Sequence, residues 1–279
     1  EYVVEETALG TGGGIRNVFA KLRYDNAMVF NGDVLSGMDL EGILTTHHSK
    51  GADVTMHLLN VADPRAFGCV PTDSEGRVTA FLEKTEDPPT NQINAGCYVF
   101  DRSVIETIPA DRVVSVERET FPGLLAGGRL VVGHVDNSYW RDMGRPDDFT
   151  RGSSDLVRGI APSPLLEGRT GESLVEPSAG IAGGVLLLSG TAVGRGSEVG
   201  AGSRLEGTVV FDGVRIEPGA IIHNSIIASG AHIGANAVID NCVIGEGAHV
   251  GARCELQAGM RVFPGVTIPD AGIRFSSDA

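Results

Sequence analysis

Basic residues are scarce in this chain, and lysine is the scarcest of them. Its 279 residues include 22 Lys and Arg against 36 Asp and Glu, which gives a formal net charge of −14 at pH 7. Because proteins that bind nucleic acids collect Lys and Arg against the phosphates, this balance argues against a nucleic-acid partner. Only three lysines occur, Lys21, Lys50 and Lys84, so a lysine beside an acidic residue at a strand end becomes a candidate for function.

The chain also has few cysteines and no long apolar run. Its four cysteines form no CxxC pair and show no histidine spacing typical of zinc, so we expect reduced, buried thiols. No run is long enough to span a bilayer and no signal peptide is recognisable, which predicts a cytoplasmic protein without a membrane partner. The chain opens on Glu1 and a strand-like Tyr2-Val3-Val4, so we expect it to begin inside a domain.

The first half of the chain alternates short apolar runs with helical patterns. Such alternation predicts an α/β domain with a Rossmann-like, mostly parallel sheet covered on both faces. The expected strands are residues 27–30, 53–61, 77–83 and 93–101, and the expected helices are 39–50, 115–125 and 147–158. Asp39 and Ser115 are the expected N-caps of two of these helices. Ligands of such sheets bind at the carboxyl ends of the strands, and Asp33 lies at one of them.

The second half has a different period. Aliphatic anchors recur every six residues, with five-residue steps at a few corners, and a glycine or another small residue often follows the anchor. This spacing fits neither a helix nor a simple strand but predicts a left-handed parallel β-helix of hexapeptide repeats. The sixteen anchors are Ile181, Leu187, Val193, Val199, Leu205, Val210, Ile216, Ile222, Ile227, Ile233, Ile239, Ile244, Val250, Leu256, Val262 and Ile268. We therefore predict a partial first domain over residues 1–158, a linker over 159–177 and the β-helix over 178–279.

Two aspartates are candidate metal ligands. Asp33 ends the segment Asn31-Gly32-Asp33, and Asp142 lies in the motif at residues 140–144. Magnesium prefers few carboxylates and keeps other positions for phosphate oxygens, so two aspartates from separate strand ends would suit it. Such a metal could orient a nucleotide and offset charge on a transferring phosphoryl group. The structural alternatives are a turn capped by Asp33 and an ion pair of Asp142 with Arg141 or Arg145.

A glycine run at residues 9–14 precedes an expected helix at 15–22. Its backbone amides could approach a base or a phosphate closely, and a helix N-terminus favours anionic atoms. The structural alternative is a flexible turn that starts a helix.

The remaining motifs offer groups for a sugar phosphate. Lys84 could meet a phosphate as a point charge and Glu83 could accept bonds from sugar hydroxyls, unless the two form only a surface ion pair. Asn94 can bond hydroxyls, and Gly96 and Gly68 leave room for a sugar ring.

Together these motifs resemble the sugar-phosphate nucleotidyltransferases, and the likeness covers nearly the whole chain, repeats included. It is most specific over residues 9–17, 29–37, 67–73, 81–89, 92–100 and 140–149. Within that family the chain is most similar to the actinobacterial enzymes that join GTP to mannose 1-phosphate. The resemblance implies a nucleoside triphosphate and a hexose 1-phosphate as substrates, GDP-mannose and pyrophosphate as products, and Mg²⁺ as cofactor.

The resemblance also implies roles for individual residues. The catalytic residues are Asp33, Lys84 and Asp142, of which Asp33 and Asp142 hold the metal. The nucleotide contacts are Gly10, Thr11 and Gly12, and the sugar-phosphate contacts are Gly68, Glu83, Lys84, Asn94 and Gly96. The chain departs from the family at Arg145, whose role stays open. It also lacks a match to the family's opening phosphate-binding loop, so we expect a fragment of a longer enzyme.

Three other functions stay open at this point. One is a non-catalytic regulatory subunit that binds a sugar nucleotide, and another is adenylyl or uridylyl transfer to glucose 1-phosphate. The third is an acyltransferase that would use a histidine of the repeats, His223, His232 or His249. The flat faces of the β-helix could pair with another copy, so we expect a homo-oligomer.

Overall fold

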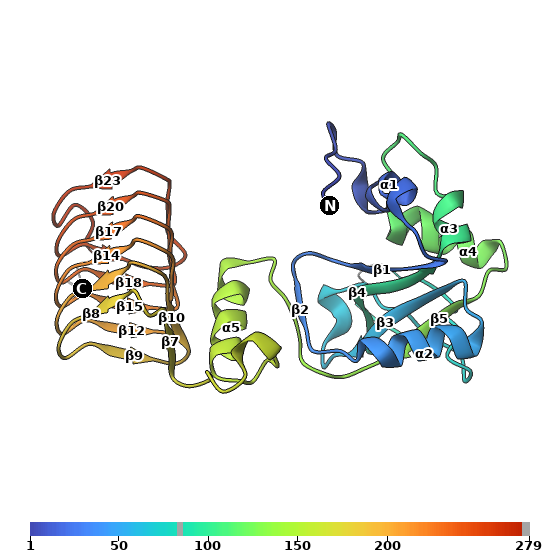
Figure 1. Cartoon of the computed structure of the whole chain (residues 1–279), viewed down its shortest axis with the longest axis horizontal. Coiled ribbons are helices and arrows are strands. Elements are labelled where there is room, and N and C mark those ends of the chain that lie inside the picture. The colour runs from blue at the N-terminus through green and yellow to red at the C-terminus, as the bar shows by residue number, and fades with distance from the viewer. Residues whose placement is uncertain (83–85, 275–279) are drawn as a thin grey trace. The chain divides into compact units, whose positions relative to one another are not determined.

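The computed structural model describes residues 1–82 and 86–274. They form two units, Glu1–Val34 with Met38–Trp140 and Leu35–Gly37 with the chain from Arg141 onward. Figure 1 labels the helices and strands of both units.

The first unit is built on a mixed sheet with the strand order β1-β4-β3-β5. Its strands are β1 (Asn26–Phe30), β3 (Val54–Asn60), β4 (Gln92–Asp101) and β5 (Val131–Val135). Strands β3 and β5 are parallel, and β4 is antiparallel to both β1 and β3. Strands β1, β3 and β5 therefore run in one direction with β4 reversed between two of them. The predicted α/β class is confirmed. Three of the four strands of this sheet point in the same direction.

Both faces of this sheet are covered, as expected for an α/β unit. Helix α2 (Leu40–Lys50) places Ile43 against Cys97 and Val99 on one face. The other face carries a cluster of aromatic rings that includes Tyr98, Phe100 and Phe121. Four helical segments contribute buried side chains to that cluster: α1 (Gly10–Asn17), α3 (Arg102–Thr107), a π-helical turn (Val116–Thr120) and α4 (Phe121–Ala126). Short 3₁₀ turns occupy Phe19–Lys21 and Pro64–Ala66.

Most of the predicted elements and both predicted caps of this unit are confirmed. The Asp39 carboxylate accepts a bond from the Glu41 amide, and the Ser115 hydroxyl accepts one from the Arg118 amide. The strand predicted over 77–83 is wrong for its described part, which forms only isolated bridges such as Thr72–Val78. The reason is a tight turn at Asp73, whose carboxylate accepts the amides of Glu75 and Arg77 and folds the segment back on itself.

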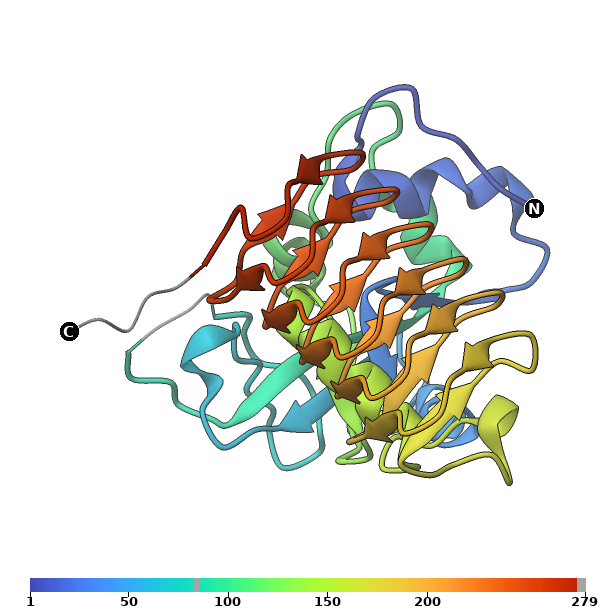
Figure 2. The same ribbon diagram turned by 90° about the vertical axis from the view of Figure 1, so that its left-hand side faces the viewer.

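The second unit is a β-solenoid whose coils stack on one another (Figure 2). One parallel sheet contains β7 (Ser173–Val175), β10 (Thr191–Val193), β13 (Val209–Val210), β16 (Ile226–Ile227), β19 (Val243–Ile244) and β22 (Arg261–Val262). The second contains β8 (Gly180–Ile181), β11 (Glu198–Val199), β14 (Arg215–Ile216), β17 (His232–Ile233), β20 (His249–Val250) and β23 (Thr267–Ile268). The third contains β9 (Leu186–Leu188), β12 (Arg204–Glu206), β15 (Ile221–His223), β18 (Val238–Asp240) and β21 (Glu255–Leu256).

The predicted anchors form the stacked rows of this solenoid, in keeping with a left-handed parallel β-helix. In one row Val199, Ile216, Ile233 and Val250 pair in register on consecutive coils. Two kinds of glycine permit this stacking. A Cβ on Gly234 would lie 2.4 Å from the Ala252 nitrogen of the next coil, whereas Gly247 takes a left-handed corner at φ +61°.

The remaining elements join the two parts of the sequence. Strands β2 (Val34–Ser36) and β6 (Trp140–Asp142) form a two-stranded sheet. Helix α5 (Pro146–Val157) belongs to the unit of the β-helix, and a 3₁₀ turn at Pro164–Leu166 precedes β7. Among the described residues no helix has the length and apolar character needed to cross a membrane.

Candidate functional site

The carboxyl ends of β1, β3 and β5 lie at the same edge of the sheet as the amino end of β4. The Asn31 amide, directly after β1, donates to the Gly96 carbonyl at 2.8 Å. Gly96 is buried at φ +79°, and a Cβ there would lie 2.8 Å from the Asn31 amide nitrogen Nδ2. Only glycine fits this position, so the predicted sugar-site residue Gly96 is held against the segment that leads to Asp33.

Asn94 is fixed by its own strand. Its Oδ1 accepts a bond from the Gly96 amide at 3.0 Å, and its Nδ2 donates to the Tyr98 hydroxyl at 2.7 Å. An irregularity in the β3–β4 pairing, where Met56 opposes Tyr98 but Leu58 opposes Asn94, makes this contact possible. Burial raises the pKa of Tyr98, so its hydroxyl stays protonated beside Asn94. We did not predict Tyr98, because the bulge that brings it to Asn94 has no recognisable sequence pattern.

A hydrogen bond and aromatic packing by Trp140 support the same end of the sheet. The Trp140 indole donates to the Ala95 carbonyl at 2.9 Å and packs edge-on against Phe67, with 5.8 Å between the ring centroids. Cys69 bridges to Ile93, which brings Gly68 beside the start of β4. The structure therefore gathers the predicted sugar-site residues Gly68, Asn94 and Gly96 around the amino-terminal part of one strand.

The glycine run is helical and packed, which corrects the helix predicted over 15–22. Helix α1 begins at Gly10, and the Gly12 amide donates to the Val114 carbonyl at 2.8 Å. A Cβ on Gly12 would lie 2.8 Å from the Val114 side chain, and one on Gly13 would lie 2.8 Å from the Arg112 carbonyl. The early helix start follows from this close packing, which the sequence pattern does not reveal.

Thr11 is also engaged within the chain. Its hydroxyl accepts a bond from the Val116 amide at 2.9 Å and donates to the Glu117 carboxylate at 3.0 Å. The glycine run thus has a packing role against residues 112–117, and nucleotide contacts by Gly10, Thr11 and Gly12 stay a prediction. Glu117 was not predicted, because its contact with Thr11 joins positions 106 residues apart.

Asp33 and Asp142 are the two predicted metal ligands. Both are exposed, and neither carboxylate has a hydrogen-bond or ion-pair partner among the described residues. Arg141, an alternative partner for Asp142, instead pairs with Asp155 at 3.0 Å and with Asp148 at 3.8 Å. Unpaired exposed carboxylates are the donors that Mg²⁺ takes together with waters and phosphates, so the donor set fits this ion.

Glu83 and Lys84 lie outside the described residues. The described residues contain no group of three or more His, Cys, Asp or Glu arranged to hold a metal, so a site here would depend on two carboxylates and on the ligand's own oxygens.

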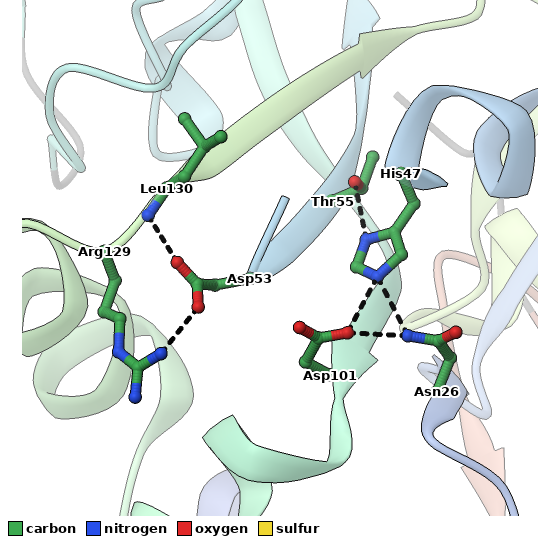
Figure 3. Close-up of polar contacts among 7 residues, drawn as sticks. All are labelled: Asn26, His47, Asp53, Thr55, Asp101, Arg129 and Leu130. Atoms are coloured by element: carbon green, nitrogen blue, oxygen red, sulfur yellow. Dashed lines mark hydrogen bonds and ion pairs between the residues drawn. The ribbon is translucent and has the colours of Figure 1, made fainter. Parts of the chain in front are cut away.

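A second polar cluster, drawn in Figure 3, lies where β1 and β3 begin and β4 ends. His47 bonds through Nδ1 to the Thr55 hydroxyl at 3.0 Å and through Nε2 to Asp101 at 3.3 Å. Asn26 donates to the same Asp101 oxygen at 2.7 Å. Burial lowers the pKa of His47, although Asp101 opposes the shift. This cluster joins α2 to the ends of β1, β3 and β4, so it stabilises the sheet and lies away from the candidate site.

The family of the chain follows from comparison with known proteins. Residues 1–159 match the family described as Nucleotidyl transferase, and residues 169–272 match the one described as GMPPB C-terminal domain. The chain therefore belongs to the nucleotidyl transferase family, and its α/β unit and β-helix are the two parts that these matches cover.

Individual relatives carry more specific names. The chain is 66% identical, over all of its 279 residues and 78% of the relative, to a protein of Mycobacterium tuberculosis named mannose-1-phosphate guanylyltransferase. It is 35% identical, over 72% of this chain and 58% of the relative, to mannose-1-phosphate guanylyltransferase 1 of Arabidopsis thaliana. A solved structure of HddC from Yersinia pseudotuberculosis, complexed with GMP-PN, shares 25% identity over 55% of this chain and 65% of that chain with a TM-score of 0.49.

Proposed function

We propose that this protein transfers a guanylyl group from GTP to mannose 1-phosphate, giving GDP-mannose and pyrophosphate. The observation that carries the proposal is the 66% identity, along the whole chain, to the M. tuberculosis protein named mannose-1-phosphate guanylyltransferase. Membership of the nucleotidyl transferase family supports the reaction class. The chain spans 78% of the M. tuberculosis relative and 58% of the A. thaliana relative.

In this reaction an oxygen of the sugar phosphate attacks the α-phosphorus of the nucleotide and pyrophosphate leaves on the opposite side. Little covalent chemistry falls to the protein, which mainly aligns two anions and offsets their charge. We assign Asp33 and Asp142 to hold Mg²⁺, which supplies charge neutralisation when bound. We assign Gly10, Thr11 and Gly12 to the nucleotide.

For the sugar phosphate we assign Gly68, Asn94 and Gly96 to the pocket, with Glu83 and Lys84 as its charged contacts. The geometry around β4 supports the pocket residues, because Asn94 and Gly96 are held in one orientation before any ligand binds. Pre-organised donors and acceptors lose little entropy on binding, which favours recognition of a sugar with a fixed pattern of hydroxyls. Homo-oligomer formation and a cytoplasmic location remain predictions.

The test is a chromatographic assay of the protein with GTP, mannose 1-phosphate and Mg²⁺. Stoichiometric GDP-mannose and pyrophosphate are the expected products, with slower turnover when ATP or UTP and glucose 1-phosphate are supplied instead. Faster turnover of those substrates would favour adenylyl or uridylyl transfer. Binding of GDP-mannose without any pyrophosphate release would favour the regulatory alternative.

A further inference from the structure

Asp142 belongs to the same compact unit as the β-helix, together with α5. Strand β6 ends at Asp142, and α5 begins four residues later at Pro146. The residues on both sides of Asp142 contact α5, although the Asp142 carboxylate itself is exposed. What holds α5 therefore also holds the backbone of Asp142.

The contacts with α5 are both ionic and steric. The Arg141 guanidinium pairs with Asp155 of α5 at 3.0 Å, and these two side chains are about three-quarters buried or more, with 27% and 16% exposed. A Cβ on Gly152 would lie 3.0 Å from the Met143 sulfur and 3.4 Å from the Arg141 Cδ. Both neighbours of Asp142 are thus packed directly on the helix.

The same helix contacts the first coils of the β-helix. The Ser154 hydroxyl donates to the Ser189 carbonyl at 2.7 Å. Gly190 approaches so closely that a Cβ on it would lie 2.5 Å from the Ser154 Oγ and 2.6 Å from its Cα. Phe149 stacks on Phe211 of a later coil, with a 6.4 Å centroid separation and an 11° angle between the rings.

The corner at Ser189 and Gly190 is itself braced within the solenoid. Glu172 accepts the Ser189 amide through its carboxylate at 3.0 Å and the Gly190 amide through its carbonyl at 2.9 Å. A contiguous series of contacts therefore runs from Asp142 through Arg141 and α5 to this rigid corner.

We propose that the β-helix positions Asp142 through α5, with Arg141, Asp155 and Gly190 as positioning residues. This inference rests on the proposed function, because it concerns the placement of a carboxylate assigned to the metal. Metal ligands must be held within about half an ångström, and loss of a supporting partner typically weakens metal affinity or activity about 10- to 100-fold. The regular solenoid would thereby fix the position of one carboxylate within its own unit.

The test compares two alanine substitutions in this protein. Gly190→Ala and Gly196→Ala both place alanine at a left-handed corner, with φ +76° and +62°, so both introduce similar backbone strain. Only Gly190→Ala also pushes on α5, because nothing lies within 4 Å of a Cβ at Gly196. Mn²⁺ affinity in the presence of GDP-mannose, measured by electron paramagnetic resonance, is the main readout, with kcat as the second.

We expect Gly190→Ala to weaken Mn²⁺ binding about 10-fold and to lower kcat by a similar factor, while Gly196→Ala stays near the wild type. Asp155→Asn, which leaves the packing volume unchanged, should weaken Mn²⁺ binding in the same direction. If folded Gly190→Ala and Asp155→Asn proteins bind Mn²⁺ with the same affinity as the wild type and Gly196→Ala, the inference is overturned. The proposed function would not be affected by that result. A wild-type protein that neither binds Mn²⁺ with GDP-mannose nor forms GDP-mannose would overturn the proposed function instead.

Discussion

The interiors of the two units are stabilised in different ways. In the β-helix, buried hydroxyls bond to the backbone of the next coil, as when Ser197 donates to the Phe211 carbonyl at 2.7 Å and accepts the Val214 amide at 3.1 Å. These partners are 14 and 17 residues apart and the arrangement recurs along the solenoid. In the sheet unit, by contrast, Asn26 donates to Asp101 across 75 residues, in a contact between two distant segments.

This difference explains why the sequence pattern reveals the packing of one unit better than that of the other. A repeat applies one contact many times, so its period reveals the packing of every coil. The sheet unit instead depends on single contacts between distant segments, and the candidate site is made of such contacts. We therefore expect substitutions at the candidate site to lower activity without lowering stability, and substitutions of the β-helix anchors to lower stability without lowering kcat.

The largest expected effect is on activity, at the sheet edge. Asp33→Asn should lower kcat at least about 100-fold, because loss of a metal ligand removes several kcal/mol of transition-state stabilisation. The melting temperature should not change, since Asp33 is exposed and has no partner among the described residues. The matched control is Asp25→Asn, another exposed aspartate near the other end of β1. Near-normal turnover by Asp33→Asn would remove Asp33 from the metal site.

The next effect is on stability, in the β-helix. Ile233→Ala should reduce the free energy of unfolding by about 2–5 kcal/mol, because Ile233 is fully buried in the stack of anchors. Ile221→Ala on the outer surface of a neighbouring coil is the control, since Ile221 is 38% exposed. Denaturant unfolding measures both changes, and kcat should stay unchanged at temperatures where the variants are folded. Equal costs for the two substitutions would contradict the inward assignment of the anchors.

A smaller effect that combines stability and activity is expected at Tyr98. Tyr98→Phe removes the acceptor of the Asn94 side chain, so we expect about 1 kcal/mol less stability and a several-fold higher KM for mannose 1-phosphate. Tyr24→Phe, at a position 81% exposed, should change neither quantity. An unchanged KM in Tyr98→Phe would mean that Asn94 does not depend on this bond for its role.

The smallest effect concerns pH, and buried histidines of the sheet unit contribute to it. Because burial lowers the pKa of His47 below its ordinary 6.5, the folded state favours neutral imidazole. The unfolded chain therefore binds the proton first, and stability that is complete above pH 6.5 is lost as the pH falls below it. His57, whose pKa burial also lowers, acts in the same direction.

His47→Gln should flatten this pH dependence without abolishing it, whereas His48→Gln should change it less, because His48 is exposed and its charge is only a minor cause of the lowered pKa of His47. Urea unfolding at a series of pH values from neutral to acidic measures the slope. An identical slope in His47→Gln and wild type would show that His47 does not contribute to it.

The sequence predicted the solenoid closely and singled out some of the residues that the structure brings together at the sheet edge, whose roles stay predictions. All sixteen anchors lie on strands of the three stacked sheets, because the period is a direct consequence of the coil geometry. The motifs at the sheet edge located Asn94 and Gly96, whose residue types suit a turn and a hydroxyl ligand. Tyr98 and Glu117 were missed, since a β-bulge and a contact across 106 residues leave no periodic signal. The packing of Gly12 and Gly13 was missed for the same reason.

The most direct test of the account is a crystal structure of the protein with Mn²⁺ and GDP-mannose, with the metal located by its anomalous signal. The account predicts a peak whose coordination shell includes carboxylate oxygens of both Asp33 and Asp142, with the Arg141–Asp155 pair intact behind Asp142. A metal bound to the nucleotide sugar without Asp142, or with other protein ligands in its place, would contradict it.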